Sequence, residues 1–469
     1  MGSLFSALQT ASTALDVFSQ ALGTSQSNVA NASTPGYAAQ QANILPIDLS
    51  GDGASVSDFI SLSSNSSAFA DATVQAASSQ ASASQTSVEQ LTPVNQLFDI
   101  TGTSGILAAL QQFSSAFSTL SVTPSDSTAQ ANALAAAGNV ASSFQSVAAS
   151  LDTQQAQIAS NIQSTLSQIN DLAGDIQQIN VRTIGEEGTS DPSTDASLRS
   201  DLDQLSSLVD ITVTKNADGS VSVLAGGQLP VVEGSQAYTI SANPAAAPGS
   251  QISSSAGGNS PPAFSGQLGA LLATDNTVIG GLLGSGGNPG TLNTLAAGFA
   301  TSVNSLLTSG VTSSGAAGVP IFTFDTTDPT NSARTLSLIS SVTPAQLAVA
   351  TTGASAESNG TANALAALPA STSSGDEIDG QSAEGFFGSI AASVGQQLSD
   401  AETASTSDQA SLTAAQTNRQ QQIGVSLDQE AANITTYQRG YDANAQVVQV
   451  LSQLTDDTVN MISGSDSAL

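Results

Sequence analysis

The chain has 469 residues, of which 39% are hydrophobic and only 9% are charged, well below the roughly 25% typical of soluble domains. Asp and Glu number 37 against 6 Lys and Arg, so the formal net charge of −31 argues against a nucleic-acid partner. His and Cys are absent, which excludes Ser-His-Asp and Cys-His nucleophile sites, the usual zinc sites and disulfide bonds.

Targeting signals and ligand sites of the common kinds are not expected. The N-terminus lacks the basic region and the continuous apolar segment of a cleavable secretory signal. No stretch approaches 18 continuous apolar residues, so we predict no membrane-spanning segment. Acidic pairs such as Asp191/Asp195 and Asp201/Asp203 lack the spacing of a calcium-binding EF-hand loop. We therefore predict no metal site, no cofactor and no catalytic residues.

The first predicted element is an amphipathic helix that begins near Leu4. Its apolar residues alternate at spacings of four and three, which forms the narrow seam expected of a coiled coil. The stripe consists of Leu4, Leu8, Ala11, Leu15, Phe18, Leu22, Ser25 and Val29. The helix ends before a turn at Thr34-Pro35-Gly36, because proline keeps Thr34 out of the helical region and Gly36 can supply the positive φ of a type II turn.

Further helices are predicted before residue 209. One runs from Ile106 to Leu120 and is closed by Pro124, and a much longer one runs from Val140 to Ile179. Gln, Ser, Ala and Asn separate the apolar residues of the long helix, which is typical of one rod in a helical bundle. A short helix with four regularly spaced leucines follows at 198–208.

Beyond residue 210 the hydrophobic period changes from helical to two. Ile211–Thr214 and Val221–Val223 flank an Asp218-Gly219 turn, which is a good hairpin signal. More strands are indicated at 231–240, a helical segment at 264–308, and strand character again at 321–339. A last internal helix holds Phe387, Ile390, Val394 and Leu398.

The C-terminal helix mirrors the N-terminal one, with apolar residues that recur every seven positions. Its predicted packing stripe contains Leu427, Ile434, Tyr437, Tyr441, Val448, Leu451 and Ile462. Isolated seams of this kind are marginal in water. We therefore expect the two terminal helices to pair as a coiled coil. We also expect the residues of both stripes, other than Ser25, to contact neighbouring subunits.

These elements predict a mainly α-helical, elongated multi-domain protein with an inserted β-rich domain and both termini at one end. The predicted domains are a terminal coiled coil (1–45 and 425–469), a helical bundle (46–209, 264–309 and 378–424) and a β-rich outer domain (210–263 and 310–377). The sequence leaves open whether residues 264–309 pack with the bundle or with the sheet.

Two motifs resemble a known family. The turn after the first helix reads NASTPGY, and its defining residues are Asn31, Thr34, Pro35, Gly36 and Tyr37. The segment Gly424–Asn433 reads GVSLDQEAAN and leads into Tyr437. Together they resemble the termini of bacterial flagellar axial proteins, most closely the hook-associated protein 1 family. The internal stretches Ile169–Asn180, Leu205–Ile211 and Gly266–Leu272 resemble that family too.

The resemblance implies a structural adaptor, not an enzyme, that joins the flagellar hook to the flagellin filament. The family's terminal segments are disordered in the free monomer and order on assembly. Implied partners are further copies in a junction ring, the hook protein, the second junction protein (hook-associated protein 3) and an export chaperone on the C-terminal segment. The implied location is extracellular, at the hook–filament junction, after type III export without signal cleavage.

Two alternatives stay open at this point. The chain could be another axial subunit, from the hook or the distal rod, although the SLDQEAAN run and the long internal helices argue against that. A remote alternative is a secreted carboxylate-dependent hydrolase on a helical stalk, which the 4% aromatic content disfavours because sugar sites use stacked aromatics.

The chain also departs from the family by reading Ala38-Ala39-Gln40 after the turn tyrosine, where relatives usually have an Arg.

Overall fold

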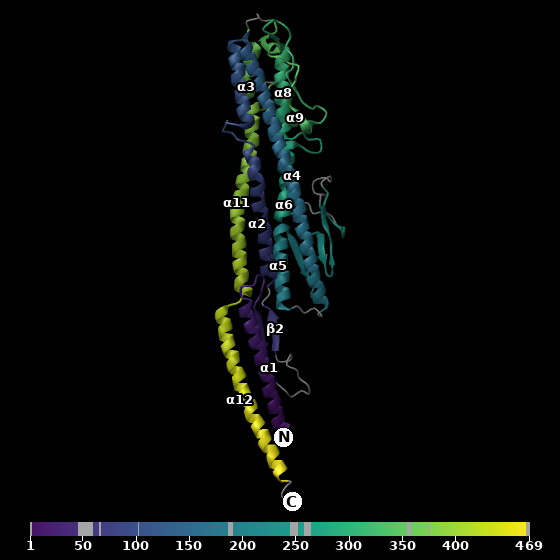
Figure 1. Ribbon diagram of the computed structural model, residues 1–469, viewed down its shortest axis with the longest axis vertical. Helices are drawn as coiled ribbons and strands as arrows, with labels where there is room; N and C mark the ends of the chain where they lie inside the picture. Colours follow the sequence, from purple (N-terminus) through teal and green to yellow (C-terminus); the bar gives the residue numbers. More distant parts are fainter. Residues whose placement is uncertain are drawn as a thin grey trace.

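The computed structural model describes residues 2–45, 60–64, 67–101, 103–185, 191–243, 252–257, 264–353, 358–373 and 375–465. Long helices run along an elongated molecule, and both termini lie at the same end (Figure 1). Three parts follow one another along its length: the terminal coiled coil, the middle rod and the head. No described helix combines the length and hydrophobicity that crossing a bilayer requires.

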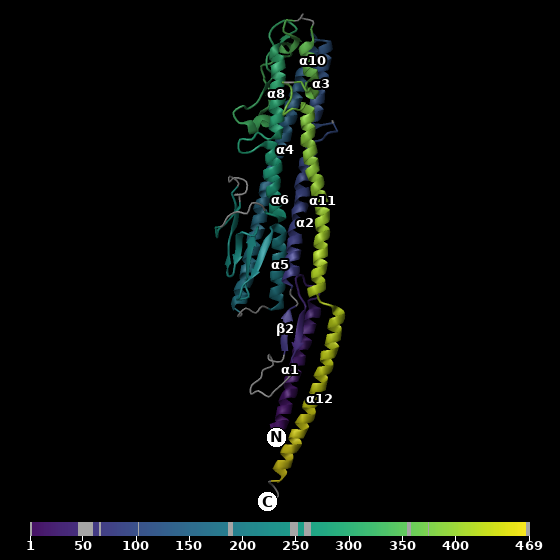
Figure 2. The same ribbon diagram turned by 180° about the vertical axis from the view of Figure 1, so that it is seen from behind.

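The terminal coiled coil consists of α1 (Gly2–Ala30) and α12 (Leu427–Ser465), which lie side by side in both views (Figures 1 and 2). An antiparallel hairpin of β1 (Gln40–Ile44) and β2 (Ile60–Ser64) packs against α1. Ile60 of the hairpin joins Val17 and Ala21 of α1 in a small apolar cluster. The structure thus pairs the two terminal helices as their apolar spacing predicts.

The middle rod is built around α2 (Ala68–Gln96) and α11 (Ala383–Ile423), which pack along each other. Beside them lie α5 (Pro192–Leu208) and α6 (Gly266–Ala273), both in contact with α2. Because α6 packs on α2, α4 and α5, the start of the 264–309 segment belongs with the helices rather than the sheet. The sequence analysis did not predict α2, because Ala, Ser, Thr and Gln form most of its buried face.

One helix, α4 (Ser127–Gly185), connects the rod to the head. Its 59 residues span roughly 90 Å at 1.5 Å per residue. Its buried face carries large apolar side chains, among them Phe144, Leu151, Ile158 and Ile176, which confirms the long helix that the sequence predicts. The helix begins earlier than predicted because the segment 127–139 is rich in alanine, which favours helix without adding a large apolar stripe.

An antiparallel sheet lies against α4 in the order β3-β4-β5-β6. Its strands are β3 (Ile211–Lys215), β4 (Val221–Ala225), β5 (Leu229–Glu233) and β6 (Gln236–Ala237), and β7 (Ile240–Ala242) pairs with β8 (Ile252–Ser254). The predicted hairpin is present, with Gly219 at a φ of +82°. Asn180 of α4 fastens the sheet, because its amide donates to the carbonyls of Val221 and Gly234 at 2.8 and 2.7 Å and accepts from the Val221 amide at 2.9 Å.

The head contains α3 (Gly105–Val122), α8 (Thr291–Ser309) and α10 (Gly360–Ala367) around the upper part of α4. The short helices α7 (Gly280–Leu283) and α9 (Ser332–Thr335) complete it, and a π-helical turn at Thr274–Ile279 precedes α7. Four rings form the centre of its core: Phe117 and Phe113 are 4.4 Å apart, Phe113 and Phe299 are 5.3 Å apart, and Phe299 and Phe322 are 6.2 Å apart, measured between ring centroids.

The strands of the head form two ladders of their own. β9 (Gly310–Thr312) pairs with β12 (Ala348–Thr351), and β10 (Phe322–Thr323) pairs with β11 (Ser337–Leu338). None of these described strands joins the β3–β6 sheet, so the strands of 210–263 and 310–377 do not pair with one another. Strand character in a sequence does not say which strands pair. The predicted domain divisions stay a prediction.

Candidate functional site

The seam between α1 and α12 relies on close approach at small residues. The ring of Phe18 lies over Gly440, where an added Cβ would come within 2.6 Å of a ring carbon. Ala14 and Ala21 are 7% and 0% exposed on α1. A side chain at Gly440 would therefore displace the Phe18 ring from its present position. This contact joins residues from opposite ends of the chain.

Most of the predicted interface residues are already wholly or partly buried within one subunit. These are Leu4, Leu8, Ala11, Leu15, Phe18 and Leu22 on α1, and Ile434, Tyr437, Val448 and Leu451 on α12. Val29, Leu427 and Tyr441 stay 40%, 56% and 41% exposed. The side chain of Ile462 lies outside the described residues. That these side chains contact other subunits remains a prediction.

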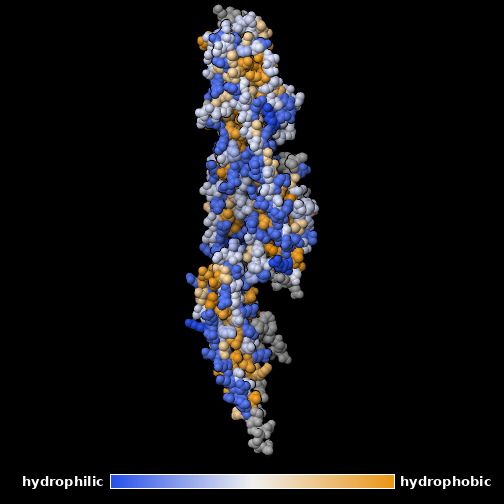
Figure 3. Space-filling model, in the orientation of Figure 1, coloured by the Kyte–Doolittle hydropathy of each residue, from blue (hydrophilic) through white to orange (hydrophobic). Residues whose placement is uncertain are grey.

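A second apolar stripe on α12 was missed from the sequence. Val447, Val450, Leu454 and Met461 are 47%, 55%, 47% and 74% exposed. Their spacings of three, four and seven place them on one helix face, about 100° around α12 from Val448 and the seam. Figure 3 shows hydrophobic residues gathered along the terminal helices. The sequence could have shown this stripe, because the apolar residues of α12 cover a wider arc of the helix surface than one partner helix can bury.

The turn after α1 has the predicted geometry. Gly36 has a φ of +76°, and the Tyr37 amide donates to the Thr34 carbonyl at 3.2 Å. The Thr34 amide in turn donates to the Asn31 carbonyl at 2.9 Å. A Cβ at residue 36 would lie 2.5 Å from the carbonyl oxygen of Ala196 on α5. Glycine is thus required here both for its backbone conformation and for the close contact with the rod.

A buried hydrogen-bond network fixes the end of α1 to the start of α12. The Asn28 amide nitrogen donates to Glu430 Oε1 at 2.9 Å and to the Gln40 carbonyl at 2.8 Å. Asn28 Oδ1 accepts from the Tyr37 hydroxyl at 2.9 Å and from the Gln40 amide at 3.0 Å. Asn28 and Glu430 are only 1% and 6% exposed. Burial, with the nearby charge of Glu430, raises the pKa of Tyr437.

Sequence reasoning missed both Asn28 and Glu430 as site residues. They are 402 positions apart, so no local spacing connects them. The nearby motifs offered a usable signal, since Asn28 lies three residues before the first residue of the turn motif and Glu430 lies inside the GVSLDQEAAN run. Together with Tyr37, they join α1, the turn, β1 and the first turn of α12 into one polar unit.

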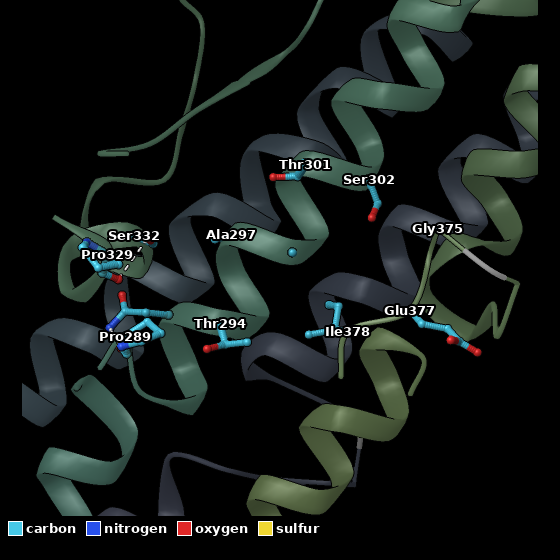
Figure 4. Close-up of a pocket in the computed structure, with 12 residues that line it drawn as sticks. Pro289, Thr294, Ala297, Thr301, Ser302, Pro329, Ser332, Gly375, Glu377 and Ile378 are labelled. Atoms are coloured by element: carbon cyan, nitrogen blue, oxygen red, sulfur yellow. Dashed lines mark hydrogen bonds between the residues drawn. The ribbon is translucent and has the colours of Figure 1, made fainter. Parts of the chain in front are cut away.

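The head contains a cleft of about 480 Å³ between α8 and the segment 375–378 (Figure 4). Hydroxyls of Thr294, Thr301 and Ser302 and one carboxylate, Glu377, line it. Elsewhere too, the described residues include no group of three or more acidic side chains placed to hold a metal ion. The cleft therefore offers polar contacts but no paired acid and base.

Two family models match parts of the chain. Residues 91–322 match the family described as the flagellar hook-associated protein FlgK helical domain. Residues 416–461 match the C-terminal family of flagellar basal body rod FlgEFG proteins. Flagellar hook-associated protein 1 of Bacillus subtilis (strain 168) is 26% identical over an alignment of 505 residues. The alignment covers 98% of this chain and 99% of that protein. This chain is a relative of flagellar hook-associated protein 1.

A solved structure supports the same relation at the level of fold. The flagellar hook junction protein FlgK from Burkholderia pseudomallei matches with a TM-score of 0.63 and 15% sequence identity. The match covers 74% of this chain and 99% of the solved one. The resemblance to hook-associated protein 1 that the two terminal motifs predict is thereby confirmed. The rod-family match at 416–461 spans most of α12, which carries the exposed stripe.

Proposed function

We propose that this chain is a structural adaptor subunit of the bacterial flagellum that joins the hook to the flagellin filament. Support comes from the relation to hook-associated protein 1 along nearly the whole chain and from the exposed stripe on α12. The stripe carries the proposal, because a helix with an apolar face left in water is expected to be covered by another protein.

The mechanism we propose is folding coupled to assembly. α1 buries its innermost apolar residues against α12 and the hairpin, whereas α12 has an apolar arc that one partner cannot cover. Covering the exposed halves of Val447, Val450, Leu454 and Met461 would contribute about 1 kcal/mol per side chain. That gain offsets the ordering cost of the terminal helices only where neighbouring subunits are present.

The proposed neighbours are further copies in a junction ring, the hook protein and the second junction protein. Before assembly, an export chaperone would shield the C-terminal helix. The proposed location is outside the cell, after export through the flagellar type III apparatus. We assign the protein no catalytic role, since its relatives are flagellar structural proteins and the head cleft offers a single carboxylate.

The test is complementation of cells that lack the chromosomal copy. Leu454→Asp should leave the protein secreted and its head folded but should abolish filament attachment, because a charge would be buried at the subunit interface. Ser452→Asp, on an exposed polar position of the same helix, is the matched control and should restore filaments. Full-length filaments in the Leu454→Asp cells would contradict the proposal.

A second measurement separates this function from that of another axial subunit. Antibody labelling of intact flagella should place the protein in a narrow band at the hook–filament joint. Labelling along the whole hook, or below it, would instead identify a hook or distal rod subunit.

A further inference from the structure

The joint between the terminal coiled coil and the rod buries Tyr37 and Ile423 beside a group of polar contacts. The apolar cluster of the coiled coil, which contains Val17, Ala21 and Ile60, is separate from the continuous core of the rod and head. One backbone hydrogen bond crosses the joint directly, from the Ala39 amide to the Ile423 carbonyl at 2.8 Å. Without a shared apolar core across the joint, polar contacts at the turn contribute to the orientation of the coiled coil on the rod.

Four charged side chains meet at this joint. Arg419 of α11 forms a two-point contact with Asp203 of α5, at 3.0 and 2.7 Å, and lies 3.5 Å from Asp71 of α2. Arg199 of α5 lies 3.3 Å from the same Asp71 and also donates to the carbonyl oxygen of Gly36. The side chains of Arg199, Arg419, Asp71 and Asp203 are only 10%, 15%, 18% and 26% exposed. We call these four residues the clamp.

The composition of the chain makes the clamp unusual. Only six Lys and Arg occur in 469 residues, and two of them are placed here, in a partly buried position where an ion is costly unless it is paired. Burial disfavours the charged form of Arg419, but hydrogen bonding to Asp203 and the charges of Asp203 and Asp71 outweigh it and raise its pKa. Bidentate arginine–carboxylate pairs also impose geometry on the groups they join.

The clamp and the Asn28 network require different parts of the chain to be folded. All four clamp side chains come from rod helices, and their contact outside the rod is the Gly36 carbonyl. The Asn28 network is completed by Glu430 of α12, so its bond between the two terminal helices cannot form until α12 is in place. The clamp can therefore hold the turn while the terminal helices are still loose.

We propose that Arg199 and Arg419, with Asp71 and Asp203, act as positioning residues that hold the Pro35-Gly36-Tyr37 turn on the rod before the terminal helices order. The clamp thereby sets the direction in which α1 leaves the rod, and the Asn28 network closes afterwards. The order of these two steps rests on the coupled folding proposed above, whereas the anchoring of the turn does not.

The test is amide hydrogen exchange, read by mass spectrometry, on the full-length free monomer. In the wild type, the amides of Tyr37 and Ala39 should be protected, since they donate to the Thr34 and Ile423 carbonyls. In Arg199→Met, exchange at these amides should be at least tenfold faster, while exchange in α3 and α8 is unchanged. Arg199→Lys should be intermediate, because one ammonium cannot match both contacts of the guanidinium fork.

Arg334→Met is the matched control. It removes the same charge and breaks an ion pair with Asp152 of α4, far from the turn, so exchange at Tyr37 and Ala39 should stay at the wild-type rate. If Arg199→Met perturbs the whole rod, Asp203→Asn is the milder variant and should accelerate the same amides. Wild-type rates at Tyr37 and Ala39 in both Arg199→Met and Asp203→Asn, or unprotected amides there in the wild type, would overturn the proposal.

The same experiment keeps the two proposals apart. Exchange along α1 and α12 in the wild-type monomer tests coupled folding, whereas the difference between variants at Tyr37 and Ala39 tests the clamp. Protected terminal helices in the free monomer would refute coupled folding. The exchange rates at Tyr37 and Ala39 would still test whether the clamp anchors the turn.

Discussion

The head and the middle rod are held together by different chemistry. The head packs Phe113, Phe117, Phe299 and Phe322 into one aromatic core. The buried face of α2 in the rod instead includes Gln75, Ser79, Ser84, Thr86 and Gln90. On α11, which packs along α2, no residue between 395 and 422, all of them described, is fully buried. Helix length and regularity therefore do not report stability in this molecule, because the large apolar side chains that are buried differ so much between these two parts.

The largest expected effect lies in the head. Phe299→Ala removes a ring that contacts both Phe113 and Phe322, so it should destabilise the head by about 3–5 kcal/mol. Chemical denaturation followed by far-UV circular dichroism would measure this. A loss below about 1 kcal/mol would mean that the aromatic core is not the main source of head stability.

The stabilities of the rod and the head can be compared directly by measuring both in one molecule. Amide exchange should give an opening free energy for residues 397–419 of α11 that is at least about 2 kcal/mol below that of α8, because exchange protection follows buried contacts. Native-state exchange at increasing denaturant is the suitable experiment. Equal protection in both helices would show that the polar seam of the rod is as stable as the aromatic core.

A smaller effect is expected at the start of α5. Hydrogen bonds from the Ser193 hydroxyl and the Thr194 amide lower the pKa of Asp191 from 3.8 to about 2. The side chain caps the helix, so Asp191→Ala should cost about 1 kcal/mol at neutral pH. Because the folded-state pKa is the lower one, the advantage of Asp191 is complete above about pH 4 and is lost as the pH falls toward 2. Thermal melts of both proteins between pH 2 and 7 would check this, and a difference that does not depend on pH would contradict it.

The smallest predicted change is a stabilisation of the rod. Within the described part of the chain, Ser79 Oγ is buried without a hydrogen-bond partner. Ser79→Ala removes that cost and introduces a better helix former, so it should stabilise the protein by up to about 1 kcal/mol. Ser78→Ala, the neighbouring position outside the buried seam, serves as the control and should change stability by a few tenths at most. A destabilisation by Ser79→Ala would show that the hydroxyl has a partner after all.

The same contrast explains what could be predicted from the sequence. α1, α4 and α12 were predictable because large apolar residues recur at helical spacing, and the β3–β4 hairpin because Asp218-Gly219 interrupts alternating residues. α2 was not predictable by that route, since its buried face is mostly small or polar. The β1–β2 hairpin was missed as well, because Ile60 and Ala42 are its main inward-facing apolar residues.

At the candidate site, local geometry was predictable and long-range pairing was not. The turn at Gly36 follows from the order of Pro and Gly, whereas Glu430, which binds Asn28, and the partners of Arg199 come from remote parts of the chain. The second stripe on α12 is also visible in the sequence as regularly spaced apolar residues. A search for one seven-residue repeat finds the seam with α1 and overlooks the stripe beside it.

The polar seam between α2 and α11 has a mechanical consequence. Small side chains that interdigitate shallowly resist sliding less than large ones do, and amides and hydroxyls can exchange partners as the helices shift. Any load passed from the terminal helices to the head must cross this segment. We expect the rod to act as the compliant part of each subunit, which would absorb strain and keep the head undeformed.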